Sequence, residues 1–302
     1  MKKILVVGSK RADASTLEPL SMIAAYVQVT LGVSSDEIAV SHVHVDELVH
    51  VLDGPSRSIY IAETREPIES FNFVWFRGKL APALNELAII CQYLAEKDVP
   101  YGNHSYGERA PFGKLAQMHS LAQLNLPYPK TVSTHANHLP AVIDREFEYP
   151  VILKAVHAGH GHSNYLVRDE AHLNELLAAE PATAFVAQTY IANDGDYRLL
   201  IVGDQQLVIH RKGSEGSHLN NTSQGGAATL VNIAEFPADV LADARRFADA
   251  CSYAISGVDV MFGVEDGKPY FLEANSQPQL MTGAFTDEKA VLVREFFLSQ
   301  IN

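Results

Sequence analysis

The stretch of sequence that decides the fold comprises two short runs, Gly257-Val258-Asp259-Val260 and Phe271-Leu272-Glu273-Ala274-Asn275-Ser276-Gln277-Pro278. Both runs are mostly apolar, as buried strands are, yet they keep Asp259, Glu273 and Asn275. A buried strand rarely keeps such groups unless they are paired or bind a metal. Between the runs, Glu265-Asp266-Gly267 is typical of a hairpin turn, so we expect two adjacent antiparallel strands here.

The hairpin is expected to bring Asp259, Glu273 and Asn275 to one place. Glu273 and Asn275 are two residues apart and therefore share a face of their strand. Three oxygen ligands without His or Cys suit Mg²⁺ or Mn²⁺, which usually also take phosphate oxygens and waters. The pattern therefore predicts a metal site and phosphoryl chemistry on a nucleotide.

The composition is that of an ordinary globular protein. A length of 302 residues is enough for about two domains. The formal net charge of −13 argues against a nucleic-acid partner, because phosphate contacts need clustered Lys and Arg. Cys91 and Cys251 lie in apolar, helix-like contexts and predict buried thiols in a reducing, cytoplasmic setting. The first apolar run stops at Gly8 and predicts a strand rather than a signal peptide, and no stretch approaches the ~20 apolar residues of a membrane span.

The first part of the chain alternates strands and helices, which predicts an α/β domain with a parallel sheet. Gly8-Ser9-Lys10 does not match the glycine fingerprint of a dinucleotide site, so none is expected there. The expected elements are strands at 3–8, 38–43, 58–62 and 71–76, helices at 17–31 and 83–96, and a short run at 99–101.

From residue 149 the pattern changes to strands and hairpins, which predicts α+β structure. We therefore expect an α/β domain over 1–105, a central α+β lobe over 106–190 and a C-terminal α+β lobe over 191–302 that carries the metal residues. The expected elements are helices at 112–124, 169–179 and 238–254, and strands at 131–134, 149–156, 164–167, 184–191, 197–202 and 207–211.

Lys154 ends an apolar strand and is followed by a glycine-containing loop. A lysine there can simply reach solvent. Such a loop can also lay backbone N–H groups over phosphates while the lysine supplies a point charge. The loop carries His157, His160 and His162, whose spacing on a hairpin does not define a tetrahedral metal site, so hydrogen bonds to phosphate are the favoured role.

The run Gln188-Thr189-Tyr190-Ile191 ends another strand. Backbone groups exposed at such an exit can pair with the edges of an adenine ring, and the alternative is an ordinary strand-to-loop transition. Asp196 and Arg198 open the next strand two residues apart and face the same side. They either form an ion pair or reach ribose and phosphate.

A polar, glycine-rich stretch extends from Arg211 to residue 226. It is either a surface loop or a loop that carries Arg211 and Asn221 over a transferring phosphate, where an arginine stabilises the developing charge. Arg77 ends the strand at 71–76. Ligands gather at the carboxyl ends of such strands, so Arg77 is a candidate anchor for a substrate carboxylate, with a surface ion pair as the alternative.

In this order and spacing the motifs resemble the ATP-grasp superfamily, and most closely its RimK-like branch of glutamate and peptide ligases. The resemblance runs from about residue 70 to 282. It implies an α/β pre-ATP-grasp domain followed by two α+β lobes that hold ATP between them. The most specific stretches are 149–154, 188–198, 211–228 and 257–278.

The resemblance also implies roles for individual residues. Arg211, Lys154 and Asn221 are the expected catalytic residues, and Arg77 and Arg198 the expected substrate-binding residues. Two Mg²⁺ or Mn²⁺ ions are expected on Asp259, Glu273 and Asn275. The expected ATP-binding residues are Lys114, Lys154, Gln188, Thr189, Tyr190, Ile191, Asp196, Asn220 and Asn221.

The implied activity is that of an ATP-dependent, ADP-forming carboxylate–amine ligase that works through an acyl phosphate. The first expectation is addition of an amino acid to a peptide or protein carboxylate. The alternatives are a small-molecule amino-acid or dipeptide ligase, a macrocycle-forming peptide ligase, and a non-catalytic ATP-binding regulator. The branch also implies a homo-oligomer, a dimer or a tetramer, and we expect neither a nucleic-acid nor a membrane partner.

Overall fold

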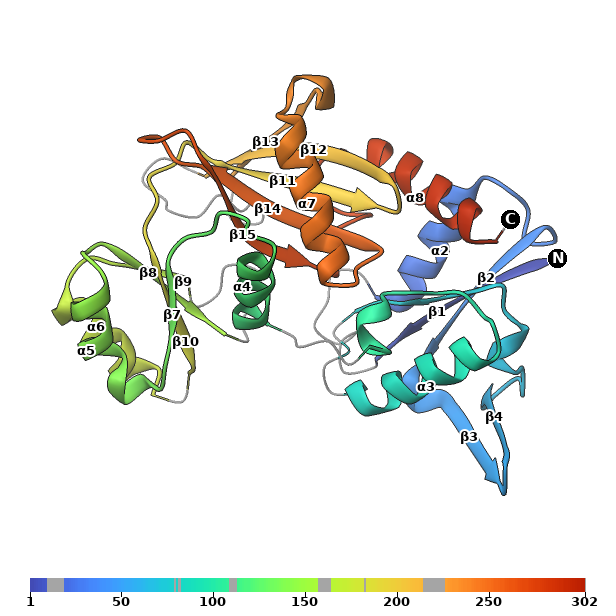
Figure 1. The fold of residues 1–302 in the computed structure, drawn as a ribbon. Coiled ribbons are helices and arrows are strands. Elements are labelled where there is room, and N and C mark those ends of the chain that lie inside the picture. Colours follow the sequence, from blue (N-terminus) through green and yellow to red (C-terminus); the bar gives the residue numbers. More distant parts are fainter. Residues whose placement is uncertain are drawn as a thin grey trace.

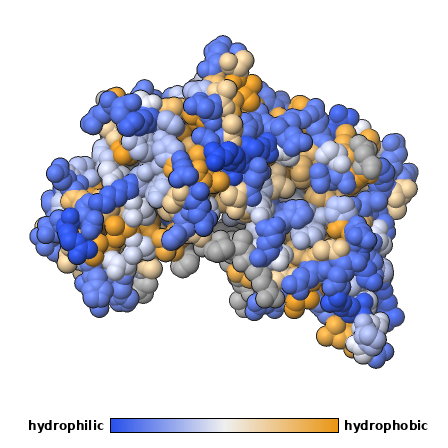
Figure 2. Space-filling model, in the orientation of Figure 1, coloured by the Kyte–Doolittle hydropathy of each residue, from blue (hydrophilic) through white to orange (hydrophobic). Residues whose placement is uncertain are grey.

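The computed structural model describes residues 1–9, 19–78, 80, 83–108, 113–156, 164–181, 183–213 and 226–301. Within these residues, three sheets of four, four and five strands carry the fold, and a two-stranded hairpin projects from it (Figure 1). The molecular face seen in Figure 2 is mostly hydrophilic, and its lower edge is hollowed between the second sheet and the first. In the described part of the chain, no helix is both long and apolar enough to cross a membrane.

The first sheet is parallel, as the alternating pattern predicts, and has the order β2-β1-β5-β6. Side chains of β1 are buried on both faces: Ile4 and Val6 pack towards α2, and Leu5 and Val7 pack towards α3. The elements are β1 (Lys2–Gly8), α2 (Leu20–Leu31), β2 (Ile38–His44), β5 (Phe73–Phe76), α3 (Leu84–Glu96) and β6 (Tyr101–Gly102).

The strand expected at 58–62 does not belong to this parallel sheet. It forms β4 (Ser56–Ile61), which pairs antiparallel with β3 (Leu48–Asp53), a strand that the sequence did not indicate. Leu48 and Ile59 pack against the first domain, whereas Leu52 is 79% exposed near the turn. A strand that is apolar on its exposed side lacks the in–out alternation that identifies a strand from sequence.

The second sheet is antiparallel with the order β7-β10-β8-β9. Two helices pack on it through Leu139, Ile143 and Leu173. As expected, Asp169 stands at the start of the second helix, and its carboxylate accepts a hydrogen bond from the backbone N–H of His172 at 2.8 Å. The elements are β7 (Thr131–Ser133), α5 (Leu139–Glu146), β8 (Val151–Ala155), β9 (Asn164–Val167), α6 (Glu170–Ala179) and β10 (Phe185–Thr189), of which α5 was not expected.

The third sheet is antiparallel with the order β13-β12-β11-β14-β15. Strand β14 and the edge strand β15 form the hairpin predicted from residues 257–278. Helices α4 and α7 cover one face of this sheet. The elements are α4 (Lys114–Gln123), β11 (Asp196–Val202), β12 (Gln205–Lys212), β13 (Ala227–Val231), α7 (Ala238–Ala250), β14 (Ile255–Phe262) and β15 (Pro269–Asn275), of which β13 was not expected.

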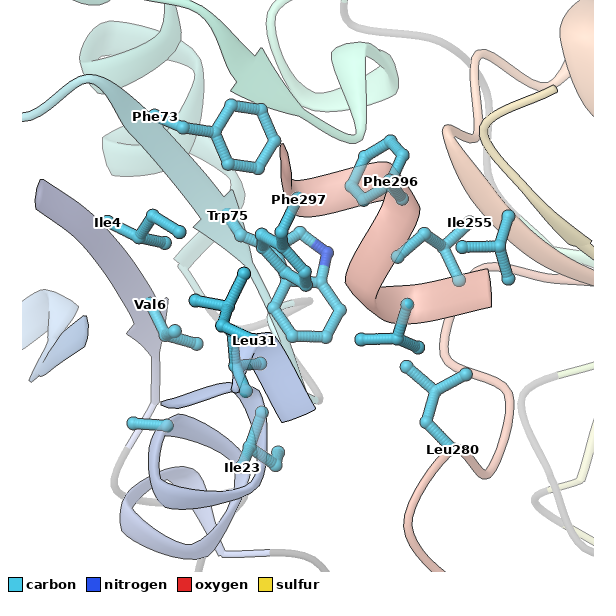
Figure 3. Close-up of a cluster of buried hydrophobic side chains, with 14 of the residues drawn as sticks. Ile4, Val6, Ile23, Leu31, Phe73, Trp75, Ile255, Leu280, Phe296 and Phe297 are labelled. Carbon is cyan, nitrogen blue, oxygen red and sulfur yellow. The ribbon is translucent and has the colours of Figure 1, made fainter. Parts of the chain in front are cut away.

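The last helix, α8 (Thr286–Ile301), was also not expected, and it joins the first and third sheets. The ring of Phe297 lies edge-on to those of Phe73 and Trp75, with centroids 5.8 and 5.1 Å apart (Figure 3). The same apolar cluster includes Leu200 of β11 and Ile255 of β14. The end of β5, which carries Arg77, is therefore held beside the third sheet.

Helix α4 covers the outer edge of β15. The side-chain amide of Gln117 donates to the carbonyl of Ala274 at 2.7 Å and accepts from its N–H at 3.2 Å. The N–H of Phe271 donates to the carbonyl of Pro127 at 2.9 Å. These contacts pair an edge that would otherwise expose backbone groups. The predicted division at residues 105 and 190 assigns α4 to the central lobe, whereas these contacts join α4 to the third sheet. The two boundaries stay a prediction.

Both cysteines are buried and neither forms a disulfide, as the composition predicted. Burial raises the pKa of Cys91 to about 12, although a hydrogen bond with the backbone of Gly107 opposes the shift. Burial likewise raises the pKa of Cys251 to about 12. Both groups therefore stay protonated thiols at neutral pH and serve as small apolar side chains.

Candidate active site

Four strands of the third sheet present a polar cluster on the face opposite α7. Cross-strand pairing places Arg198 opposite Asp259, Asp196 opposite Arg211, and Asp259 opposite Glu273. Asp196 and Arg198 share a face, as their spacing predicted, because alternate residues of a strand point the same way. Further along this face, Leu200 packs towards α8, so the polar cluster borders an apolar core.

Two arginines and two aspartates form a nearly buried network in this cluster. Arg198 donates from Nε to Oδ1 of Asp259 at 2.7 Å and from Nη2 to Oδ2 at 2.6 Å. Arg211 donates from Nε to Oδ1 of Asp196 at 2.6 Å, and its Nη2 lies 3.0 Å from Oδ2 of Asp259. Bidentate, charge-assisted contacts of this kind hold both partners in a defined orientation.

The network shifts the pKa values of its two carboxyl groups in opposite directions. Burial acts to raise the pKa of Asp259, but Arg198 and Arg211 outweigh it and hold this pKa below its ordinary value. Burial raises the pKa of Asp196, Arg211 opposes that effect, and repulsion from Asp259 adds to it. Asp259 is therefore an anion at neutral pH, as a metal ligand must be.

The hairpin brings the three predicted metal ligands together. Asp259 lies across from Glu273, with a bulge between Asp259 and Val260, and the side-chain amide of Asn275 donates to Oε1 of Glu273 at 2.9 Å. The donor set of two carboxylates and one amide fits a hard divalent cation. Asp259 already pairs with the guanidinium groups of Arg198 and Arg211, so its carboxylate compensates positive charge in the ligand-free protein. Among the residues that the structure describes, no group of three or more His, Cys, Asp and Glu side chains could hold a metal ion.

Two lysines approach this cluster from other parts of the fold. Lys114 is the first residue of α4, and Lys154 lies on β8 of the second sheet. Burial lowers the pKa of each, and attraction to Glu273 opposes the shift in both cases. Repulsion from Lys114 lowers the pKa of Lys154 further. The charge of Glu273 therefore acts on both ammonium groups, one from α4 and one from the second sheet.

The predicted adenine segment, Gln188 to Ile191, comprises the last two residues of β10 and the two that follow. Gln188 is buried, and its amide donates to Oγ1 of Thr131 at 2.8 Å, which ties the strand end to β7. Thr189, Tyr190 and Ile191 come next and are partly buried. The backbone then turns to the third sheet, where Val264 donates to the carbonyl of Ala192 at 2.8 Å. The strand end thus lies between the two lobes, and its contact with adenine stays a prediction.

Arg77 is buried and connects the first sheet to the segment after β15. Its Nη2 donates to the carbonyl of Pro278 at 2.6 Å, and its guanidinium lies 5.4 Å from the ring of Trp75. The N–H of Gly78 donates to Oε1 of Gln277 at 2.9 Å. Arg77 therefore orients the segment that follows the predicted metal ligands, and its contact with substrate stays a prediction. Asn220, Asn221 and the histidines at 157, 160 and 162 lie outside the described residues.

A pocket that is open to solvent adjoins the arginine network. Sequence reasoning missed two of its polar residues, Gln279 and Lys289. Lys289 is buried near the start of α8, and its ammonium donates to the carbonyl of Thr282 at 3.1 Å. The acidic residues that open α8 and the apolar residues that follow could have indicated this helix. The pocket is also lined by Arg198, Leu200, Ile209 and Arg211.

The chain belongs to the RimK-like ATP-grasp family, because residues 113–290 match the model of the RimK-like ATP-grasp domain. Among curated proteins, it is 28% identical over 173 residues to the ribosomal protein bS6–L-glutamate ligase of Escherichia fergusonii. It is 27% identical over 173 residues to the ligase of the same name from Escherichia coli O139:H28. Each match covers 55% of this chain and 56% of the relative, so it spans little more than half the length of these proteins.

Three solved structures have a similar fold over nearly the whole chain, each with a TM-score of 0.68. The ATP-grasp ligase PsnB, complexed with a phosphomimetic variant of a minimal precursor, Mg and ADP, is 15% identical and covers 100% of this chain and 99% of its own. The macrocyclase MdnC from Microcystis aeruginosa, bound with precursor peptide MdnA, is 12% identical and covers 98% and 99%. The D-alanyl-alanine synthetase A of Vibrio cholerae is 17% identical and covers 99% and 97%. At these identities they confirm the predicted α/β and α+β ATP-grasp fold, and only the fold.

We expect Lys154→Met to stabilise the ligand-free protein by about 1 kcal/mol, because it removes a charged group that burial disfavours. Such gains are common when a functional site loses an unfavourably placed group. Since burial lowers the pKa of Lys154, the cost of its charge is fully present below the folded pKa. The cost disappears as the pH rises to the unfolded value of about 10.4. Urea unfolding should therefore show a larger gain at pH 7 than at pH 10. The control Lys130→Met, at an exposed lysine, should show no gain, and an equal gain at both pH values contradicts this explanation.

Proposed function

We propose that the protein is an ATP-dependent, ADP-forming carboxylate–amine ligase. The observation that supports this most directly is the convergence of Lys114 and Lys154 on Glu273, next to Asn275 and Asp259. Two cations from separate parts of the chain are attracted to Glu273, which adjoins the other carboxylate and the amide. This is the arrangement that a nucleotide triphosphate with its metal requires.

In the proposed reaction, an oxygen of a substrate carboxylate forms a bond to the γ-phosphorus, and the bond from that phosphorus to the oxygen of the leaving ADP breaks. An amine then attacks the acyl carbon, the bond to phosphate breaks, and the amine loses a proton to solvent. The products are an amide, ADP and phosphate. No protein nucleophile is needed, and the buried, protonated thiols of Cys91 and Cys251 fit that scheme.

The residues of the chain supply position and charge for this reaction. Lys114 and Lys154 are proposed to hold the phosphates, and Arg211, fixed by Asp196, to face the transferring group. Asp259, Glu273 and Asn275 are proposed to hold two Mg²⁺ or Mn²⁺ ions. When bound, the metal neutralises charge on the phosphates and orients them. The backbone at Thr189 to Ile191 is proposed to bound the adenine.

For the substrates, we propose addition of an amino acid to a peptide or protein carboxylate. Relatives named as ligases of glutamate to a ribosomal protein support this, as do similar folds solved with bound precursor peptides. A small-molecule amino-acid ligase is the second candidate, and its support is the similar fold of a D-alanyl-alanine synthetase. A cytoplasmic homo-oligomer remains our prediction for the state of the protein in the cell.

The test is ADP release with Mg²⁺ and ATP across the twenty amino acids, alone and with a panel of short peptides. We expect release to rise only when a particular carboxylate and a particular amine are both present, and the product mass to equal their sum less one water. Nucleotide binding without stimulated release by any pair, or by a candidate protein acceptor, would instead favour the non-catalytic regulator.

A further inference from the structure

Arg198 pairs with Asp259, the carboxylate that is also predicted to bind a metal ion. Its two nitrogens bond both oxygens of Asp259, at 2.7 and 2.6 Å. Asp259 is only 4% exposed, so water cannot readily replace these bonds. A divalent cation on Asp259 and a guanidinium in this position would be like charges in direct contact, which is unfavourable in a buried site. Metal and Arg198 therefore compete for Asp259.

Arg198, rather than Arg211, is the group that is free to move. Arg211 has a second anchor on Asp196 and its side chain is 5% exposed. The side chain of Arg198 is 21% exposed, and among the described residues its hydrogen bonds go to Asp259 alone. Displacement of Arg198 costs one ion pair, whereas displacement of Arg211 would leave Asp196 without its partner.

The pocket beside the network offers Arg198 a second position. Arg198 lines this pocket together with Leu200, Ile209 and Gln279. Its side chain passes over Gly257, where an added Cβ would lie 3.3 Å from both Cδ and Nε of the arginine. A side chain that lies over a glycine on one side and against an open pocket on the other can change its rotamer without moving the backbone.

We propose that Arg198 is an internal cation that holds Asp259 in the ligand-free protein and leaves it when a metal–nucleotide complex binds. The guanidinium then points into the pocket and takes a carboxylate of the substrate. This inference rests on the proposed ligase function and adds to it an order of binding, in which the metal–nucleotide complex precedes the substrate carboxylate. Since binding free energies are reciprocally coupled, nucleotide loading strengthens carboxylate binding, and the carboxylate strengthens nucleotide binding.

The first test is calorimetric binding of Mn²⁺·ADP to the full chain, which allows no turnover. Arg198→Gln removes the competing charge, and Arg211 still pairs with Asp259, so the variant is expected to fold. We expect it to bind Mn²⁺·ADP at least 10-fold more tightly than the wild type, with Arg198→Lys between the two. The control Arg246→Gln, on the far side of α7 beside Asp243, should bind like the wild type. Equal or weaker binding by Arg198→Gln overturns the proposal.

The second test follows Arg198 in the wild-type protein by phenylglyoxal labelling and peptide mass spectrometry. We expect Arg198 to be labelled several-fold faster with saturating Mn²⁺·ADP than without it, while labelling of Arg246 is unchanged. Slower or equal labelling of Arg198 overturns the movement into the pocket. If the wild type binds no Mn²⁺·ADP, the proposed function itself fails. If it binds but Arg198→Gln gains nothing, only the present inference fails.

Discussion

Glu273→Gln or Asn275→Ala is expected to lower kcat/KM for ADP release about 10³-fold, the scale on which loss of one preorganised electrostatic group acts. Glu273 is the carboxylate on which both lysines converge, and Asn275 bonds to it at 2.9 Å. Glutamine keeps the shape of Glu273 but not its charge, so metal and lysines lose their common partner. The free energy of unfolding should change by less than about 1 kcal/mol, because neither residue belongs to an apolar core.

The matched control is Glu265→Gln in the turn of the same hairpin, where the carboxylate is exposed. It should leave both turnover and stability unchanged. The measurement is ADP release with a responsive substrate pair, together with urea unfolding of each variant. Wild-type turnover in either Glu273→Gln or Asn275→Ala would falsify the metal assignment.

Arg211→Ala is expected to reduce the free energy of unfolding by about 3–5 kcal/mol, the usual cost of breaking a buried ion pair by removing one partner. Arg211 bonds Asp196 at 2.6 Å and lies 3.0 Å from Asp259, and all three side chains are nearly buried. Without the guanidinium, Asp196 keeps no hydrogen-bond partner from the network. The charged carboxylate of Asp196 would then be buried without a partner, or it would be neutralised by protonation.

Urea unfolding measures this effect, and a second substitution tests its cause. Asp196→Asn in the Arg211→Ala background should recover part of the loss, because the orphaned charge is gone. Arg246→Ala is the control: Arg246 pairs with Asp243 at 2.7 Å near the surface and should cost about 0–1 kcal/mol. Additive costs for the two network substitutions, or a loss below 1 kcal/mol for Arg211→Ala, contradict the buried-pair explanation.

The elements that sequence reasoning predicted are those whose pattern is local. The hairpin of β14 and β15 needs only two apolar runs and a turn, so its antiparallel pairing and the approach of Asp259 to Glu273 followed from residues 257–278. The parallel first sheet followed from alternating runs in the same way. Strand β3 was not predicted, although β4 was, because the exposed apolar residues of β3 hide the alternation that marks a strand.

The partners of the predicted site residues did not follow from the sequence. Arg77 was expected to meet a substrate carboxylate, and it donates to the carbonyl of Pro278, 201 residues away. Gln117 was given no role, yet its amide pairs the backbone of Ala274 between two predicted ligands. Such contacts depend on how α4 and α8 pack, and sequence periodicity predicts a helix without saying which sheet it covers.

By itself, the sequence predicted the residue types of the proposed site: oxygen ligands at Asp259, Glu273 and Asn275, a cation at Lys154 and, through the family resemblance, another at Lys114. Only the tertiary structure decided that Arg198 reaches Asp259 across 61 residues of chain and that Arg211 joins it to Asp196. The physical reason is that residue types and local periods depend on neighbours a few positions away, whereas strand order and ion pairing depend on how distant elements pack against a common core.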